Sequence, residues 1–216
     1  MPGACPANTE VTGLATCRLN FPSARGSAIE PIPSSSDLLR TRYSRPVGSE
    51  VIAVYDSSGR EVGAEDRAVV YRDGLWHASA GVLVRSGDGR SIYVHRRTDT
   101  KMVFAGMHDC IAGGVLAPAE TPRQTAVREL AEELGIIPDT DPTPLTRTSW
   151  DGEWAGRPMR CHMYVYELRY DGPVHHQPEE IADGWWWPEQ TLREHLADPA
   201  WPFVPDSRVL LQGILT

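Results

Sequence analysis

The sequence predicts a mixed α/β domain with a large share of antiparallel sheet. Segments rich in strand-forming residues are joined by tight turn signals, such as the SGDG tetrapeptide at 86–89, and these favour hairpins. One amphipathic helix is expected in the middle of the chain, over 122–134, and two more near its end. Because strands and helices do not alternate strictly, a purely parallel sheet is not expected.

Composition indicates a globular protein with room for one domain and an extension. The chain has 216 residues, of which 41% are hydrophobic and 23% charged. It contains neither a signal-peptide pattern nor the ~18-residue apolar run of a membrane helix. The formal net charge is −8, and no basic stripe for a nucleic-acid duplex occurs. The four cysteines form no Cys-x-x-Cys pair, so we expect a cytoplasmic protein with reduced thiols and no membrane or duplex partner.

The first 48 residues differ from the remainder of the chain. They are rich in proline, include a run of three serines and show little apolar periodicity. This pattern predicts an irregular extension over 1–48, with one short helix near 37–42, and a folded domain over 49–216.

The elements of the folded domain follow from local patterns along the chain. Runs of β-branched, aromatic and small apolar residues bounded by turn signals predict strands at 51–55, 68–71, 77–85, 91–96, 144–150, 159–169 and 185–187. Helical spacing predicts two late helices, at 188–196 and 206–211. Asp206 or Ser207 is the expected N-cap of the second one.

The helix over 122–134 carries the clearest boundary signals. Thr121 precedes it as N-cap, Gln124 completes the spacing of a capping box, and Gly135 follows as a stop. Proline at the first helical position is also typical of a helix start. The apolar positions expected to face the core are Val127, Leu130 and Leu134.

Three carboxylates share one face of this helix. Glu129, Glu132 and Glu133 stand at positions i, i+3 and i+4. Like charges at this spacing repel each other by roughly 0.2–0.5 kcal/mol per exposed pair. A divalent cation would reverse the sign of this interaction, and Mg²⁺ prefers oxygen ligands completed by water and phosphate oxygens. The alternative is a solvated acidic helix face, which is the usual role of a charge run.

The wider pattern around these glutamates resembles the signature of the Nudix hydrolase family. Read in full, it is Gly114, five residues, Glu120, seven residues, Arg128-Glu129-Leu130, one residue, Glu132-Glu133, one residue and Gly135-Ile136. The match has no gap or substitution. The resemblance implies a Nudix-type α/β/α sandwich with a mixed sheet and a loop–helix–loop catalytic motif over Gly114–Ile136. It also implies a hydrolase that uses Mg²⁺ or Mn²⁺ to cleave a diphosphate linkage in a nucleoside diphosphate joined to another moiety.

The resemblance assigns roles to the signature residues. The metal ligands would be Glu129, Glu132 and Glu133, with Gly114 or its neighbour adding a carbonyl and Glu120 supporting the loop or binding a further metal. Arg128 would orient Glu129 by a charged hydrogen bond, and one glutamate would accept a proton from water. A late acidic residue, Glu180 or the adjacent Glu179, would act as base or as a further ligand unless it lies in a surface loop.

The segment 95–114, HRRTDTKMVFAGMHDCIAGG, resembles the isopentenyl-diphosphate isomerase branch of the same superfamily. That branch holds the substrate diphosphate with an arginine and a lysine four residues apart, which Arg97 and Lys101 match. Its cysteine would stand where this chain has Gly113, since Cys110 lies three residues too early. Of its metal-binding histidines, only His77 has a counterpart.

Two alternatives to hydrolysis therefore stay open: an isomerase-like enzyme, and a catalytically idle binding or regulatory domain of the same fold. For the hydrolase, the expected partner is a phosphorylated small-molecule substrate. A homodimer is expected by analogy alone.

Overall fold

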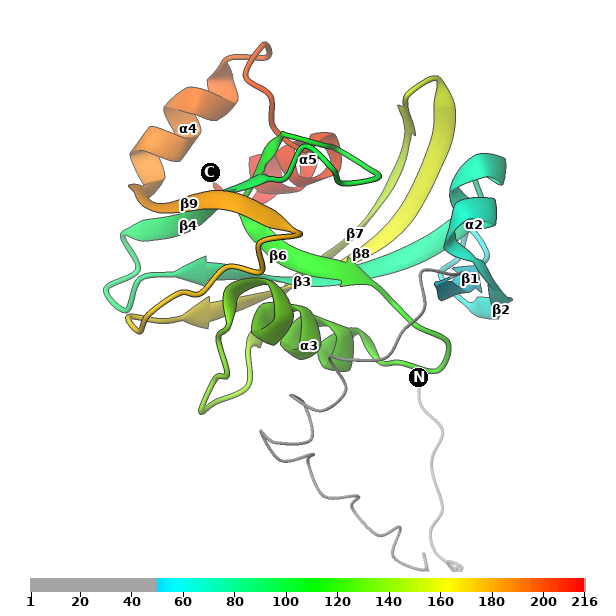
Figure 1. Ribbon diagram of the computed structural model, residues 1–216, viewed down its shortest axis with the longest axis horizontal. Helices are drawn as coiled ribbons and strands as arrows, with labels where there is room; N and C mark the ends of the chain where they lie inside the picture. Colours follow the sequence, from blue (N-terminus) through cyan, green and yellow to red (C-terminus); the bar gives the residue numbers. More distant parts are fainter. Residues whose placement is uncertain (1–49, 216) are drawn as a thin grey trace, which may run out of the picture. The chain divides into compact units, whose positions relative to one another are not determined.

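The structure, a computed structural model, describes residues 50–215 (Figure 1). The predicted extension over 1–48 and its helix at 37–42 lie outside the described residues, so the domain boundary there stays a prediction. Across residues 50–215, no helix is both long enough and apolar enough to cross a membrane.

Residues 50–215 fold into nine strands and four helices. In chain order these are β1 (Val51–Tyr55), β2 (Glu61–Asp66), α2 (Arg67–Asp73), β3 (Trp76–Arg85), β4 (Ser91–Arg97), β5 (His108–Asp109), β6 (Ile111–Val115), α3 (Pro122–Leu134), β7 (Thr143–Trp154), β8 (Arg157–Arg169), β9 (Ile181–Pro188), α4 (Glu189–Ala197) and α5 (Pro205–Ile214). The strands predicted at 51–55, 77–85, 91–96, 144–150, 159–169 and 185–187 are all present, some with longer bounds.

Strand β3 lies at the centre of the sheet. It pairs parallel with β8, from Trp76 opposite Arg160 to Arg85 opposite Arg169. It also pairs antiparallel with β6. Strand β7 pairs antiparallel with β8 and forms a long hairpin with it. Strand β1 pairs with β2. Strand β4 pairs with both β5 and β9. The sheet is therefore mixed, as the sequence predicted.

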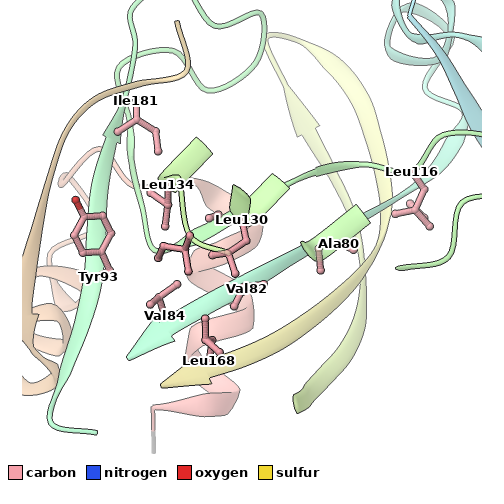
Figure 2. Packing of buried hydrophobic residues seen from close by; sticks show 13 residues of the cluster. Ala80, Val82, Val84, Tyr93, Leu116, Leu130, Leu134, Leu168 and Ile181 are labelled. Carbon is pink, nitrogen blue, oxygen red and sulfur yellow. The ribbon is translucent and has the colours of Figure 1, made fainter. Parts of the chain in front are cut away.

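Helices cover both faces of this sheet because successive side chains of β3 point to opposite sides. Val82 and Val84 face α3 and pack with its Leu130 and Leu134 (Figure 2). Leu83 points the other way, into a cluster that includes residues of α4 and α5: Leu192, Leu210 and Leu211. The predicted α/β/α sandwich is confirmed.

The strand predicted over 68–71 is wrong, since these residues lie in α2. The Asp66 side chain caps this helix by accepting the Ala68 N–H at 2.8 Å. Gly74 ends the helix in the left-handed conformation, with φ of 62°. Val70 is fully buried in a small cluster that also contains Ile52. Caps and packing therefore outweigh the strand preference of adjacent β-branched residues.

The expected N-cap of the last helix is also wrong. Helix α5 starts at Pro205, and its N-cap is Val204, which makes no side-chain capping bond. Asp206 and Ser207 lie inside the first turn instead. Proline at the first helical position supplies the fixed φ that starts this helix without a polar cap.

Candidate active site

Helix α3 holds the predicted acidic face in a defined orientation. The capping box is present: Gln124 N–H donates to Thr121 Oγ1, and Thr121 N–H donates to Gln124 Oε1 at 2.9 Å. Gly135 ends the helix with φ of 66°. The stripe that packs on the sheet is centred on Ala126, with Leu130 and Leu134. Val127 is only partly buried, a one-position difference from the expected stripe.

Glu133 joins the helix to the sheet at the catalytic motif. Its side chain is 3% exposed, and Oε2 accepts the N–H of Gly113 on β6 at 3.1 Å. Burial, together with the negative charge of Glu129, raises the pKa of Glu133 to about 8. A buried carboxylate with a second one beside it is an arrangement that a cation would stabilise.

Glu129 lies directly against the first glycine of the motif. A Cβ added to Gly114 would stand 2.1 Å from Glu129 Oε1, so only glycine leaves room for this carboxylate. Burial also raises the pKa of Glu129 above its usual range. The predicted contact with Arg128 is present: Nη1 donates to Glu129 Oε1 at 2.6 Å.

Arg128 connects the helix to the loop that precedes it. It contacts both carboxylate oxygens of Glu120, at 2.9 and 3.2 Å. Glu120 in turn accepts the N–H of Ala117 at 3.1 Å, which ties down the loop. Nη1 also donates to Glu132 at 3.1 Å. One guanidinium therefore sets the positions of three of the predicted acidic residues.

The donor set fits a hard divalent cation by its chemistry. The candidate ligands Glu120, Glu129, Glu132 and Glu133 offer only oxygen atoms, which Mg²⁺ and Mn²⁺ prefer. The glycine at 114 makes room for the Glu129 carboxylate, which lies where a Cβ would stand. In this conformation the carboxylates are engaged by Arg128 and a backbone N–H, and no three His, Cys, Asp or Glu side chains within 50–215 converge on one point.

The structure brings the predicted diphosphate-binding residues to the same place. Lys101 forms an ion pair with Glu180. Burial, together with the positive charge of Arg97, lowers the pKa of Lys101 to about 8. Both cations act electrostatically on Glu133. Arg97 Nη2 donates to the carbonyl of Val103 at 3.2 Å, which holds the loop that carries Lys101.

The late acidic segment is attached to that same loop. Thr98 N–H donates to the Glu180 carbonyl at 3.1 Å, and Thr98 Oγ1 donates to the Glu179 carbonyl at 2.9 Å. Of the two glutamates that the sequence proposed, Glu180 is therefore the one whose carboxylate meets Lys101.

Sequence reasoning missed a third cation, Arg67. It pairs with Glu50 at 2.7 Å, and its Nε donates to the Tyr71 hydroxyl at 3.1 Å. Its charge acts on Lys101 and helps to lower the pKa of that residue. The available signal was Asp66, a good N-cap, but interpreting 68–71 as a strand hid the helix that carries Arg67.

The cysteine and the histidine that were compared with the isomerase branch are both buried. Cys110 is 2% exposed and belongs to the core cluster on the α4 and α5 side of the sheet, opposite α3. Burial raises the pKa of its thiol well above the usual range. His77 is 4% exposed, and the Tyr71 ring packs edge-on against it at 5.3 Å. Both side chains are buried in the interior of the domain.

Comparison with known proteins places the chain among named relatives. A model of the NUDIX domain matches residues 75–207. A Rhodococcus erythropolis protein named Uncharacterized Nudix hydrolase orf19 is 63% identical over 166 residues, which cover 75% of this chain and 90% of that protein. A Streptomyces coelicolor protein, also named as an uncharacterized Nudix hydrolase, is 38% identical over 157 residues, 73% of this chain and 83% of that one.

A solved structure shows the same fold. The crystal structure of DR0079 from Deinococcus radiodurans matches with a TM-score of 0.64 at 23% identity, and the match covers 76% of this chain and 98% of that one. Signature, fold and relatives lead to one conclusion: the chain belongs to the Nudix hydrolase family, whose members act on pyrophosphate bonds.

Proposed function

We propose that this protein hydrolyses, in a Mg²⁺-dependent reaction, a diphosphate linkage in a nucleoside diphosphate joined to another moiety. The proposal rests on one observation: negatively and positively charged side chains act on each other at this site. The carboxylates of Glu129 and Glu133 on α3 face the cations of Arg97 and Lys101 closely enough for each set to act on the other. A diphosphate with a bound cation is a ligand that complements both sets.

Each group has a defined part in this proposal. Glu129, Glu132 and Glu133 would hold the cation, with Glu120 and the Gly114 carbonyl as further oxygen donors. When bound, Mg²⁺ supplies charge neutralisation of the diphosphate and lowers the pKa of water. Such chemistry depends mostly on positioning and on electrostatic stabilisation.

The chain's own side chains then orient the reactants. Arg97 and Lys101 bind the phosphate oxygens by charge-assisted hydrogen bonds and thereby fix the phosphorus relative to α3. A glutamate accepts the proton of the attacking water, and Glu180 is a candidate because its carboxylate lies at Lys101. Arg128 keeps Glu129 in place. The products are a nucleotide and the phosphorylated second moiety, since water adds across one P–O–P bond.

The structure gives no support to the isomerase alternative, because Cys110 is buried on the far side of the sheet. The idle-domain alternative would leave Glu129 and Glu133 beside each other with no ligand to offset their repulsion. A cytoplasmic location and a homodimer stay predictions of the sequence.

The test is a screen for the two hydrolysis products, the nucleoside monophosphate and the phosphorylated second moiety, over nucleoside diphosphate derivatives in Mg²⁺ and in EDTA, with isopentenyl diphosphate included and its isomers analysed. Glu133→Gln keeps the shape of the side chain and removes its charge. Glu194→Gln makes the same change at an exposed glutamate of α4 and is the matched control.

We expect cleavage that is lost in EDTA and in Glu133→Gln but kept in Glu194→Gln. Isomerisation without phosphate release would contradict the proposal. So would Mg²⁺ binding, measured by calorimetry, without turnover of any compound in the panel.

A further inference from the structure

A cleft of about 240 Å³ opens beside the cations of the candidate active site. Residues of helix α2 form one wall, residues of the loop after Lys101 a second, and residues of the turn between β7 and β8 a third. Helix α2 and the strands β7 and β8 are labelled in Figure 1. The lining of the cleft includes the aromatic and thioether side chains of Tyr71, Met102, Trp154 and Met159 and the guanidinium groups of Arg72 and Arg157. The volume lies below the roughly 300–1,000 Å³ of most ligand pockets, which suits one part of a substrate.

The cleft adjoins the diphosphate-binding residues through two of its walls. Met102 and Val103 directly follow Lys101 in the chain, and the Val103 carbonyl accepts a hydrogen bond from Arg97 at 3.2 Å. On the opposite wall, Tyr71 accepts a hydrogen bond from Arg67, whose charge acts on Lys101. A diphosphate held by these cations would therefore direct its attached group into the cleft.

An aromatic contact holds the loop and the hairpin together around the cleft. Phe104 is 6% exposed, and its ring packs edge-on against Trp154 at 4.7 Å and against Trp150 at 6.3 Å. Its φ of 55° is uncommon for a bulky residue. Backbone conformations of this kind persist where surrounding structure enforces them, and they are frequent at ligand clamps.

The side chains of the walls disfavour an occupant that donates hydrogen bonds. None of the ten lining side chains is Asp, Glu, Asn, Gln, Ser or Thr. The Tyr71 oxygen already accepts from Arg67, and the Arg72 guanidinium is paired with Asp73 at 2.7 Å. An amino or hydroxyl hydrogen placed here would meet no carboxylate, amide, serine or threonine side chain to accept it, because the guanidinium groups of Arg72 and Arg157 can only donate. Thioether and aromatic walls instead favour a soft, apolar group.

We infer that this cleft binds the second moiety of the substrate, and that this moiety is an apolar group without hydrogen-bond donors. The inference rests on the proposed function and narrows it. It identifies Trp154 as the residue that sets specificity, because its side chain lines the cleft and is held in place by Phe104.

Two matched diesters test the inference: adenosine 5′-diphosphate esterified on its second phosphate with benzyl alcohol or with methanol. The two compounds differ only in the alcohol part of the ester, which is benzyl in one and methyl in the other. We expect the wild-type kcat/KM to be about tenfold or more higher for the benzyl ester. In Trp154→Ala the benzyl value should fall about tenfold while the methyl value stays within a factor of two. Trp185→Ala, which removes a 37% exposed tryptophan outside the cleft, should change neither.

Equal kcat/KM for the two esters in the wild type, or an equal loss of both in Trp154→Ala, would overturn the inference. If neither diester is cleaved, the proposed function fails but the cleft can still be judged by calorimetry with benzyl phosphate and methyl phosphate. Benzyl phosphate that binds the wild type about tenfold more tightly than Trp154→Ala supports the cleft. Affinities that are equal in the two proteins count against it.

Discussion

Arg128 and Glu120 form a bidentate ion pair across the start of α3, with Nε to Oε1 at 2.9 Å and Nη2 to Oε2 at 3.2 Å. This pairing uses two donors of the guanidinium and leaves Nη1 for Glu129 at 2.6 Å. The loop and the candidate metal ligand are thus held by one planar group. Lysine, a single point charge, cannot reproduce that arrangement.

Replacing Arg128 with lysine should lower kcat/KM about 10- to 100-fold, which is the usual cost of losing a group that orients a metal ligand. The physical reason is the loss of orientation at Glu129, since the positive charge is kept. Steady-state kinetics checks the loss, and urea unfolding confirms that the variant is folded. A variant with full activity would show that Glu129 needs no such support.

Replacing Lys101 with glutamine should raise KM about 10- to 100-fold with a smaller effect on kcat, because a charge-assisted hydrogen bond to the diphosphate contributes about 1.5–3 kcal/mol. The substitution also frees the Glu180 carboxylate. Lys101→Arg keeps the charge and should recover part of the affinity. If kcat falls while KM is unchanged, Lys101 acts on the chemical step and the proposed role in binding is wrong.

His77 and His95 should make the folded state more sensitive to acid. Burial lowers their pKa values to about 4 and about 3, and nearby Arg97 adds to the shift at His95. Between pH 6.5 and about 4 the unfolded chain therefore binds protons that the folded chain does not, so stability falls as pH falls. Each histidine contributes about 1.4 kcal/mol per pH unit in this range.

Asp206 acts in the opposite direction, because burial raises its pKa to about 7. The effect of His95 on stability is therefore measured as the difference in unfolding free energy between the wild type and a variant without this histidine. Urea unfolding of the wild type and of His95→Phe at pH 7 and pH 5 should show the variant gaining about 2 kcal/mol relative to the wild type on acidification. An unchanged difference would mean that His95 is protonated inside the folded protein.

Arg85→Met should destabilise the domain without altering the site. The Arg85 side chain joins β3 to β8 and α4, through Glu167 at 2.9 Å and Glu189 at 2.6 Å. Breaking a buried ion pair costs about 3–5 kcal/mol, and we expect the low end because both carboxylates touch water. Chemical denaturation measures the loss. Below the transition, kcat should equal that of the wild type.

Cys110→Ala should leave the hydrolytic rate within a factor of two. The thiol packs in the core on the α4 and α5 side of the sheet, and burial keeps it protonated. A thiol reagent should likewise leave Cys110 unlabelled in the native protein, which peptide mass spectrometry can show. A large loss of hydrolytic rate in a variant that unfolds like the wild type would show that the thiol takes part in the reaction.

Helix α3 could be predicted from the sequence because its signals are local. The capping box, the glycine stop and the spacing of the glutamates all lie within Thr121–Gly135. The contacts of Arg128 also follow from one helix and its loop. The two layers of helices and the mixed sheet were predicted from the family signature rather than from strand patterns.

What the sequence could not predict depends on contacts between distant segments. Strand β6 reads IAGGV and contains two glycines, yet it forms because β3 lies alongside it. Helix α2 depends on the burial of Val70, which no local pattern reveals. The position of Arg67 near Lys101, and the cleft under Trp154, follow from these elements and were therefore missed.

The parallel pairing of β3 with β8 also constrains synthesis on the ribosome. A nascent chain that has emerged as far as Leu134 contains the whole catalytic motif, and α3 can form at once from local contacts. One edge of β3 nevertheless stays unpaired until the segment Arg157–Arg169 has left the exit tunnel. During that interval the central strand presents an open apolar edge of the kind that other chains can join. Translation speed between these two segments therefore bears on how much of the protein reaches its native state.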